Sequence, residues 1–207
     1  MSTRLIEPVK DNRDKQHTYA ENIRRYNRAL KQGFYFEAIL IDYALMEDRL
    51  RSFIYYIGGL KSKNSYKIGK GIVRERLAEI VDRYKLESEN SNLGITNISS
   101  RIKIIRSTLV WAASIEKTPE DKYLKTLKSQ YEGQLDIGGL LEMLESIESW
   151  CKYRNELIHA LMNKNINSVD EAVESQAVMG MELARYLDGQ VKALKKGNWI
   201  RRSVNYK

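Results

Sequence analysis

Apolar residues recur every three or four positions along most of this chain, which is the spacing of a helix with one buried face. No stretch shows the alternation of apolar and polar positions that marks a half-buried strand, and no internal repeat is visible. The pattern predicts helices over residues 15–31, 34–57, 72–84, 98–115, 118–131, 140–162 and 168–196. The predicted fold class is therefore all-α, a helical bundle.

Chain length and the two ends of the pattern indicate how the domain is organised. At 207 residues, the chain suits one domain around a single core. Residues 1–14 are polar and mixed in charge, and they predict a loose N-terminal arm. Residues 15–197 make up the predicted helical domain, and residues 198–207 form a basic C-terminal tail.

Two of the predicted helices carry a charged residue inside an otherwise apolar stripe. Glu47 interrupts the stripe of 34–57, and Arg154 interrupts that of 140–162. A charge left buried alone costs about 3–5 kcal/mol, so we expect Glu47 to lie near Arg154, as an ion pair or through water. The alternative is a narrower stripe from which Glu47 reaches solvent. The apolar members are Phe36, Leu40, Tyr43, Leu50, Ile54 and Ile57 in the first stripe, and Leu140, Leu144, Ile147, Cys151, Ile158 and Leu161 in the second.

Arg154 is followed directly by Asn155, and His159 stands about one helical turn after Asn155. These residue types suit phosphodiester cleavage that needs no metal. Imidazole can take and give a proton near neutral pH, and an arginine fork matches two phosphate oxygens and stabilises charge that builds on phosphorus. In RNA the 2′-hydroxyl supplies the nucleophile, and Asn155 can orient the imidazole or the phosphate.

Each of these residues also has a purely structural interpretation. His159 can be an ordinary surface or interface histidine, and Arg154 can be a structural partner of Glu47. The single cysteine, Cys151, lies on the apolar stripe and is predicted to be a small buried side chain. Because the chain has two histidines, one cysteine and no aspartate-rich cluster, we expect no zinc site and no other cofactor.

The segment Arg154-Asn-Glu-Leu-Ile-His159, late in a helical bundle and followed by one further long helix, resembles the HEPN superfamily. Members share an Arg-x(4–6)-His motif, commonly with a polar residue directly after the arginine. The resemblance implies a HEPN-like core of four to five helices, here with an additional N-terminal helix. It also implies a dimer in which the motif helices of two protomers line one cleft. Arg154 and His159 would be the catalytic pair, and Asn155 the supporting polar residue.

Many HEPN members are metal-independent endoribonucleases of toxin–antitoxin, phage-defence and CRISPR systems, whereas others are scaffolds or binding modules without activity. The resemblance therefore implies RNA as substrate, a homodimer, and an antitoxin protein as a further candidate partner. In one subgroup, a nucleotidyltransferase antitoxin modifies a tyrosine two residues after the histidine. Here that position is Leu161, so this mode of control is not expected.

The chain carries a formal net charge of +8, which favours polyanionic partners such as RNA. The glycine-rich loop 60–71 and the C-terminal tail concentrate basic residues. The candidate RNA contacts are Lys61, Lys63, Lys67 and Lys70 in the loop and Arg201 and Arg202 in the tail. The alternatives are a solvated connector for the loop and a tail whose Trp199 docks on the core.

No apolar run approaches the ~20 residues of a membrane span, and the N-terminus has no apolar signal core. We therefore expect no membrane partner and a cytoplasmic location. The leading hypothesis is a HEPN-like endoribonuclease that cleaves RNA at a shared dimer cleft. The second is a catalytically silent HEPN-like dimer that binds RNA or a protein. The third is an unrelated helical protein whose basic face contacts DNA or an acidic partner.

Overall fold

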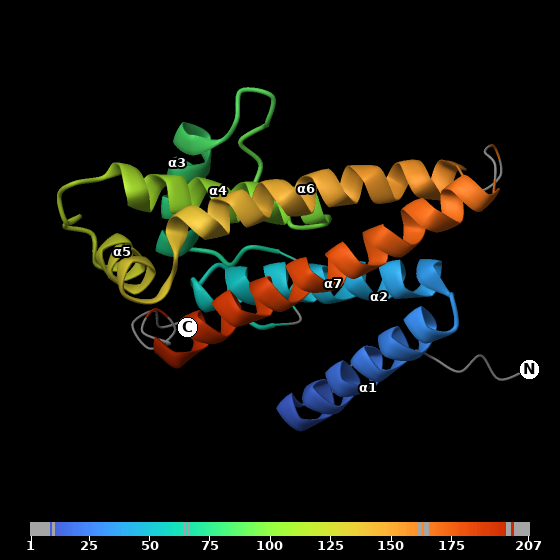
Figure 1. Cartoon of the computed structure of the whole chain (residues 1–207). Helices are drawn as coiled ribbons and strands as arrows, with labels where there is room; N and C mark the ends of the chain where they lie inside the picture. The colour runs from blue at the N-terminus through green and yellow to red at the C-terminus, as the bar shows by residue number, and fades with distance from the viewer. Residues whose placement is uncertain are drawn as a thin grey trace, which may run out of the picture.

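A computed structural model describes residues 9, 11–63, 65, 67–160, 163, 166–197 and 200, apart from the side chains of residues 12 and 166–171. Within these residues the chain forms seven α-helices and no strand (Figure 1). The helices are α1 (Asn12–Lys31), α2 (Tyr35–Tyr56), α3 (Ile72–Tyr84), α4 (Ile98–Ser114), α5 (Lys122–Gln134), α6 (Ile137–Ala160) and α7 (Ile166–Gly197). The predicted all-α helical bundle is confirmed.

Side-chain caps set several of the helix starts. The Asp11 carboxylate accepts hydrogen bonds from the backbone N–H groups two and three residues ahead, so α1 includes the last residues of the predicted arm 1–14. Asn97 caps α4 by accepting the N–H of Ser100 at 2.8 Å. The start predicted at residue 118 is wrong, because α5 begins behind Asp121, which accepts the N–H of Leu124 at 3.0 Å. A carboxylate that receives these N–H groups also faces the positive end of the helix dipole.

The two longest helices begin earlier than predicted. α6 starts at Ile137 rather than at residue 140, and it takes Gly138 and Gly139 into its first turn. Asp136 makes this possible, because its carboxylate accepts the N–H of Gly139 at 3.1 Å. α7 starts at Ile166, two residues before the predicted position. Glycine lowers helix propensity by about 1 kcal/mol, but a cap and the packing of the rest of the helix outweigh this cost.

α2 is the central element of the bundle. It lies alongside α7 for most of its length, and it also contacts α1 and α4. α6 runs antiparallel to α2 and α7, and it rests on α7 and α4 (Figure 1). Because neighbours surround α2 on several sides, its buried residues are not confined to the predicted stripe. Leu50, Ile54 and Ile57 are buried as expected, whereas Leu40 is 56% exposed.

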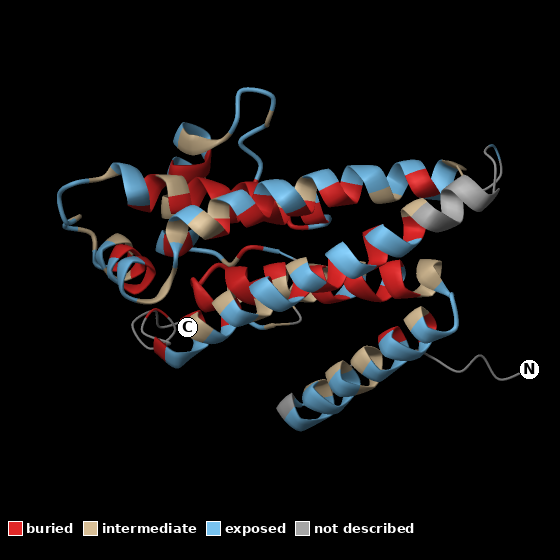
Figure 2. Cartoon of the chain, viewed as in Figure 1, coloured by how far each residue is buried: buried red, intermediate tan, exposed pale blue. Residues whose placement is uncertain are grey.

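The core lies where α2, α4, α6 and α7 face one another, and α1 is largely exposed (Figure 2). α1 is attached through Tyr26 and Ala29, which are both buried. The Tyr26 hydroxyl donates to the backbone carbonyl of Ala177 in α7 at 3.0 Å. No helix in the described part of the chain combines the length and apolar character needed to cross a membrane.

A reciprocal pair of hydrogen bonds joins α6 to α7. The Trp150 indole N–H donates to the Gln176 carbonyl at 2.8 Å, and the Gln176 amide donates to the Trp150 carbonyl at 2.9 Å. Gly180 lies close by, where a Cβ atom would come within 2.7 Å of the Trp150 ring and of the Asp42 carboxylate. This close packing fixes the position of α6 directly before the Arg-Asn-x-x-x-His segment.

Candidate functional site

The candidate site occupies the last two turns of α6. Before it, the predicted stripe holds, because Leu140, Leu144, Ile147 and Cys151 are all buried. After Cys151 the stripe departs from the prediction: Leu157 is buried and Ile158 is 38% exposed, while Leu161 lies outside the described residues. Figure 1 shows that this end of α6 extends beyond α4, and with fewer neighbours the helix buries a different side. Burial raises the pKa of the Cys151 thiol to about 11, consistent with a structural cysteine.

Arg154 is half-buried and lies against α2. Its guanidinium carbon stands 4.2 Å from the centre of the Tyr43 ring, a cation–π contact. One of its terminal nitrogens donates to the Asn155 side-chain oxygen at 2.8 Å. The buried Nε atom has no hydrogen-bond partner, and no described carboxylate forms an ion pair with this arginine. Arg154 is thus held in place by a ring and an amide, without an ion pair to any carboxylate in the described part of the chain.

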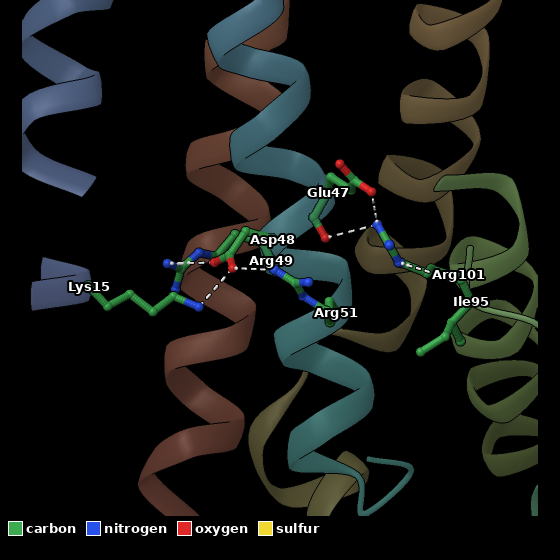
Figure 3. Close-up of polar contacts among 7 residues, drawn as sticks. All are labelled: Lys15, Glu47, Asp48, Arg49, Arg51, Ile95 and Arg101. Atoms are coloured by element: carbon green, nitrogen blue, oxygen red, sulfur yellow. Dashed lines mark hydrogen bonds and ion pairs between the residues drawn. The ribbon is translucent and has the colours of Figure 1, made fainter. Parts of the chain in front are cut away.

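The ion pair predicted between Glu47 and Arg154 is wrong, because Glu47 pairs with Arg101 of α4. The Arg101 guanidinium donates to the Glu47 carboxylate at 2.7 Å and to the Ile95 carbonyl at 3.0 Å (Figure 3). The Arg101 side chain is 2% exposed, so it is the deeper cation and needs the carboxylate more. The sequence contained this signal, since Arg101 stands at helical spacing from Ile98 and Ile105 in an apolar run.

The pKa of the Tyr43 hydroxyl is nevertheless affected by both Glu47 and Arg154. Burial raises the pKa of its hydroxyl, the Glu47 carboxylate raises it further, and the Arg154 guanidinium acts in the opposite direction. Both charged residues therefore act on one tyrosine, although Glu47 forms its ion pair with Arg101. The Glu47 side chain also keeps 37% of its surface exposed, which matches the narrower-stripe alternative in part.

Asn155 and His159 are both exposed. They are four residues apart on α6 and therefore share one face of the helix. Arg154 and His159 are five residues apart, which places their side chains about 140° apart around the helix axis. The backbone carbonyl of His159 accepts a hydrogen bond from the Asn163 side chain at 3.2 Å. This bond satisfies one of the free carbonyl groups at the C-terminal end of α6. One chain thus presents the arginine and the imidazole on different sides of the same helix.

The structure describes four of the six predicted basic contacts, all of them in the loop after α2. Lys61, Lys67 and Lys70 are exposed, and Lys63 is half-buried. The backbone of Lys67 forms an isolated antiparallel bridge with that of Gly94. Lys63 instead lines a pocket near α1. The remaining predicted contacts, Arg201 and Arg202, lie outside the described residues, as does Trp199.

Asp42 is a buried carboxylate that the functional reading of the sequence missed. It lies in α2 with 0% of its surface exposed, and neither of its oxygens has a hydrogen-bond partner. Burial raises the pKa of this carboxyl group to about 8, against a smaller opposing effect of Arg185. The signal was present, because Asp42 interrupts the apolar run 39–46. We interpret Asp42 as a structural acid that is protonated at neutral pH.

In the described part of the chain, no three His, Cys, Asp or Glu side chains are grouped so that they could hold a metal ion. The candidate site thus consists of Arg154, Asn155 and His159, with Tyr43 as the support of the arginine. The chain was compared with protein-family models, with curated proteins and with solved structures, and none of the three comparisons gave a match.

Proposed function

We propose that this protein is a metal-independent endoribonuclease of the HEPN type that acts as a homodimer. Arg154, Asn155 and His159 of both chains would face one cleft. The 2′-hydroxyl of RNA attacks the adjacent phosphorus, the bond to the 5′-oxygen breaks, and a cyclic 2′,3′-phosphate and a 5′-hydroxyl remain. His159 moves the protons, and Arg154 stabilises the negative charge on the phosphoryl oxygens.

The observation that carries this proposal is the state of Arg154. A half-buried guanidinium ordinarily has a carboxylate partner, because desolvation of an unpaired charge is costly. Here the carboxylate expected for that role is engaged by Arg101, and the Nε atom of Arg154 lacks a partner. A guanidinium fixed on a tyrosine ring with unused donors is suited to an anion from outside the chain. A phosphodiester is the anion that the nearby imidazole can process.

The geometry of one helix supports the requirement for two chains. Because Arg154 and His159 diverge by about 140° around α6, a substrate held by the arginine of one chain is out of line with the same chain's imidazole. A second α6 packed across a two-fold axis can place its His159 opposite the first chain's Arg154. A two-fold interface repeats every contact, so such a cleft contains two complete sets of motif residues.

Exposed apolar side chains lie near Arg154 and favour a dimer interface at this surface. Leu40 is 56% exposed one turn before Tyr43, and Ile158 is 38% exposed one turn after Arg154. Because α2 and α6 run antiparallel, both residues extend the Tyr43–Arg154 contact in the same direction (Figure 1). Exposed apolar side chains around a fixed guanidinium have the composition of an interface centre.

Charge substitution at this surface is expected to break the dimer. The double variant Leu40→Glu, Ile158→Glu places two acids at the symmetric interface, and its dimer dissociation constant should rise by about tenfold or more, because like charges oppose each other across the two-fold axis. Sedimentation equilibrium measures the change. The control is Ile72→Glu, Leu86→Glu, which replaces two similarly exposed apolar residues in and just after α3. A wild-type monomer, or equal dissociation constants in both double variants, contradicts this interface.

The proposed activity is tested with purified protein, mixed cellular RNA and tRNA in the presence of EDTA. Wild type should cleave, and His159→Ala should lose about 10²–10⁴-fold in rate, the usual contribution of a general acid–base group. His17→Ala is the matched control, since His17 is the chain's other histidine and is exposed on α1. Cleavage that survives His159→Ala contradicts the proposal. Salt-dependent RNA binding without cleavage would instead favour a silent binding module.

A further inference from the structure

A pocket of about 390 Å³ lies between α1, α2 and α7 and includes Lys63 from the loop after α2. It is separate from the candidate nuclease site, because none of Arg154, Asn155 and His159 lines it. Figure 3 shows the two polar networks on opposite sides of α2, with Lys15 and Arg49 towards α1 and the Glu47–Arg101 pair towards α4. The pocket's volume is within the range of small-molecule sites.

The lining of the pocket is strongly basic. Five basic side chains and one acidic side chain face it: Lys15, Arg49, Lys63, Lys192, Lys195 and Asp188. They come from three helices and a loop that are far apart in the sequence, so the fold brings this charge together. Such a concentration of like charge opposes folding unless an anion accompanies it. The arrangement therefore indicates a ligand with several negative charges.

The acids around the pocket are already shared among several cations. Asp48 contacts Lys15 at 2.7 Å, Arg49 at 3.2 Å and Arg51 at 3.4 Å. Burial favours the neutral form of Asp48, but these three cations hold its pKa below the usual value. Burial also lowers the pKa of the Lys15 ammonium, and Asp48 offsets this only in part. The lowered pKa of Asp48 thus reflects three cations that share one carboxylate.

Arg49 is the most rigidly held cation of the pocket. Its guanidinium stacks 4.3 Å from the centre of the Tyr19 ring, and it reaches Asp188 at 3.2 Å. The side chain is 14% exposed, and its buried Nε atom has no hydrogen-bond partner. Asp188 in turn also contacts Lys192 at 2.6 Å. Arg49 is thus held by one ring and two carboxylates, Asp48 and Asp188, and the surrounding lysines supply adjustable point charges for phosphoryl oxygens.

We propose that this pocket binds a compact ligand that carries two or more phosphoryl groups, either an inorganic or a nucleoside polyphosphate. Several phosphoryl groups match the five cations better than one carboxylate or one phosphate does. The pocket walls formed by Tyr19 and Tyr56 can contact a ring if the ligand has one. The inference concerns a second site and is independent of the ribonuclease proposal.

Isothermal titration calorimetry at low salt tests the inference with inorganic triphosphate, ATP and adenosine as probes. Triphosphate and ATP should bind and adenosine should not, and added salt should weaken binding. Equal affinity for triphosphate and ATP identifies the phosphates alone as the recognised group, and tighter ATP binding identifies a nucleoside polyphosphate. Failure of both phosphate probes to bind the folded protein overturns the inference, and so does adenosine binding as tightly as ATP.

Matched variants locate the binding. Lys63→Gln, Lys195→Gln removes two lining charges and should weaken triphosphate binding by about tenfold or more. The control, Lys61→Gln, Lys196→Gln, changes exposed neighbours in the same loop and the same helix by the same net charge, and neither residue lines the pocket. Equal affinities of the two double variants would overturn the assignment to this pocket. Both pairs avoid the half-buried Arg49, so we expect the variants to keep the fold.

Discussion

Asp42→Asn is expected to make the protein more stable at pH 8 by an amount on the order of 5 kcal/mol. In the folded protein, burial raises the pKa of the Asp42 carboxyl to about 8 from an ordinary value of 3.8, and each pKa unit corresponds to about 1.4 kcal/mol. Asparagine has nearly the same shape as the protonated acid and never ionises. At pH 8 the Asp42 carboxyl is ionised in the unfolded chain but is held partly neutral in the folded protein, which costs free energy. The substitution removes this cost.

The sign of the pH dependence follows from the raised pKa. Below about pH 4, Asp42 is protonated in both the folded and the unfolded chain, so it adds no pH dependence. Between about pH 4 and pH 8 the unfolded chain releases the proton while the folded chain keeps it, so the wild-type free energy of unfolding falls as pH rises. Above about pH 8 this contribution is constant.

Urea unfolding of wild type and Asp42→Asn at several pH values from 4 to 8 measures this difference. The two proteins should have similar stability near pH 4 and diverge steadily up to pH 8, in favour of the variant. Glu182→Gln, an exposed change on α7, is the control for the loss of one carboxylate. A constant difference between wild type and Asp42→Asn across the range would show that Asp42 titrates normally in the folded protein.

Substitution of Arg154 is expected to have a large effect on catalysis with little effect on the fold. Arg154→Ala should slow RNA cleavage by about 10²–10³-fold, as loss of a group that stabilises transition-state charge commonly does. Arg154→Lys keeps the charge but loses the planar fork, so its rate should lie between wild type and alanine. Thermal unfolding should change only slightly, because a partly exposed cation–π contact contributes about 0.5–1 kcal/mol.

Rates under single-turnover conditions, together with RNA affinity, separate catalysis from binding. Lys152→Ala, an exposed change two residues earlier on α6, controls for the loss of one positive charge from this helix. It should weaken RNA binding modestly and leave the cleavage step unchanged. If Arg154→Ala and Lys152→Ala have the same small effect, Arg154 is an ordinary surface cation and the proposed role is wrong.

The fold class was accessible from the sequence because helix periodicity is a local property. The range predicted for α3 agrees with the structure, and the other helices differ mainly at their ends. Those ends depend on caps such as Asp11 and Asp121, which compete with nearby alternatives of similar strength. Packing of the remaining turns decides whether Gly138 and Gly139 join α6.

The details of the candidate site depend on which faces meet, and periodicity does not determine this. Glu47 and Arg154 were matched because each was a charge in an apolar stripe, but Arg101 in α4 satisfied the same description and is more deeply buried. Leu40 was assigned to the core, yet it is exposed because the helices around α2 leave that side uncovered. The basic pocket combines residues from α1, α2 and α7, and no local pattern predicts that combination.

The chemistry of the RNA ends is the most direct test of the central claim. Wild-type protein in excess EDTA is incubated with a defined RNA, and the new ends are identified by mass spectrometry and by phosphatase and kinase treatment. We predict cyclic 2′,3′-phosphate and 5′-hydroxyl ends, and no cleavage of the same RNA with a 2′-deoxy residue at the cleaved position. Products with 5′-phosphate ends, cleavage of the 2′-deoxy substrate, or no cleavage by the dimeric wild type would contradict the proposed function.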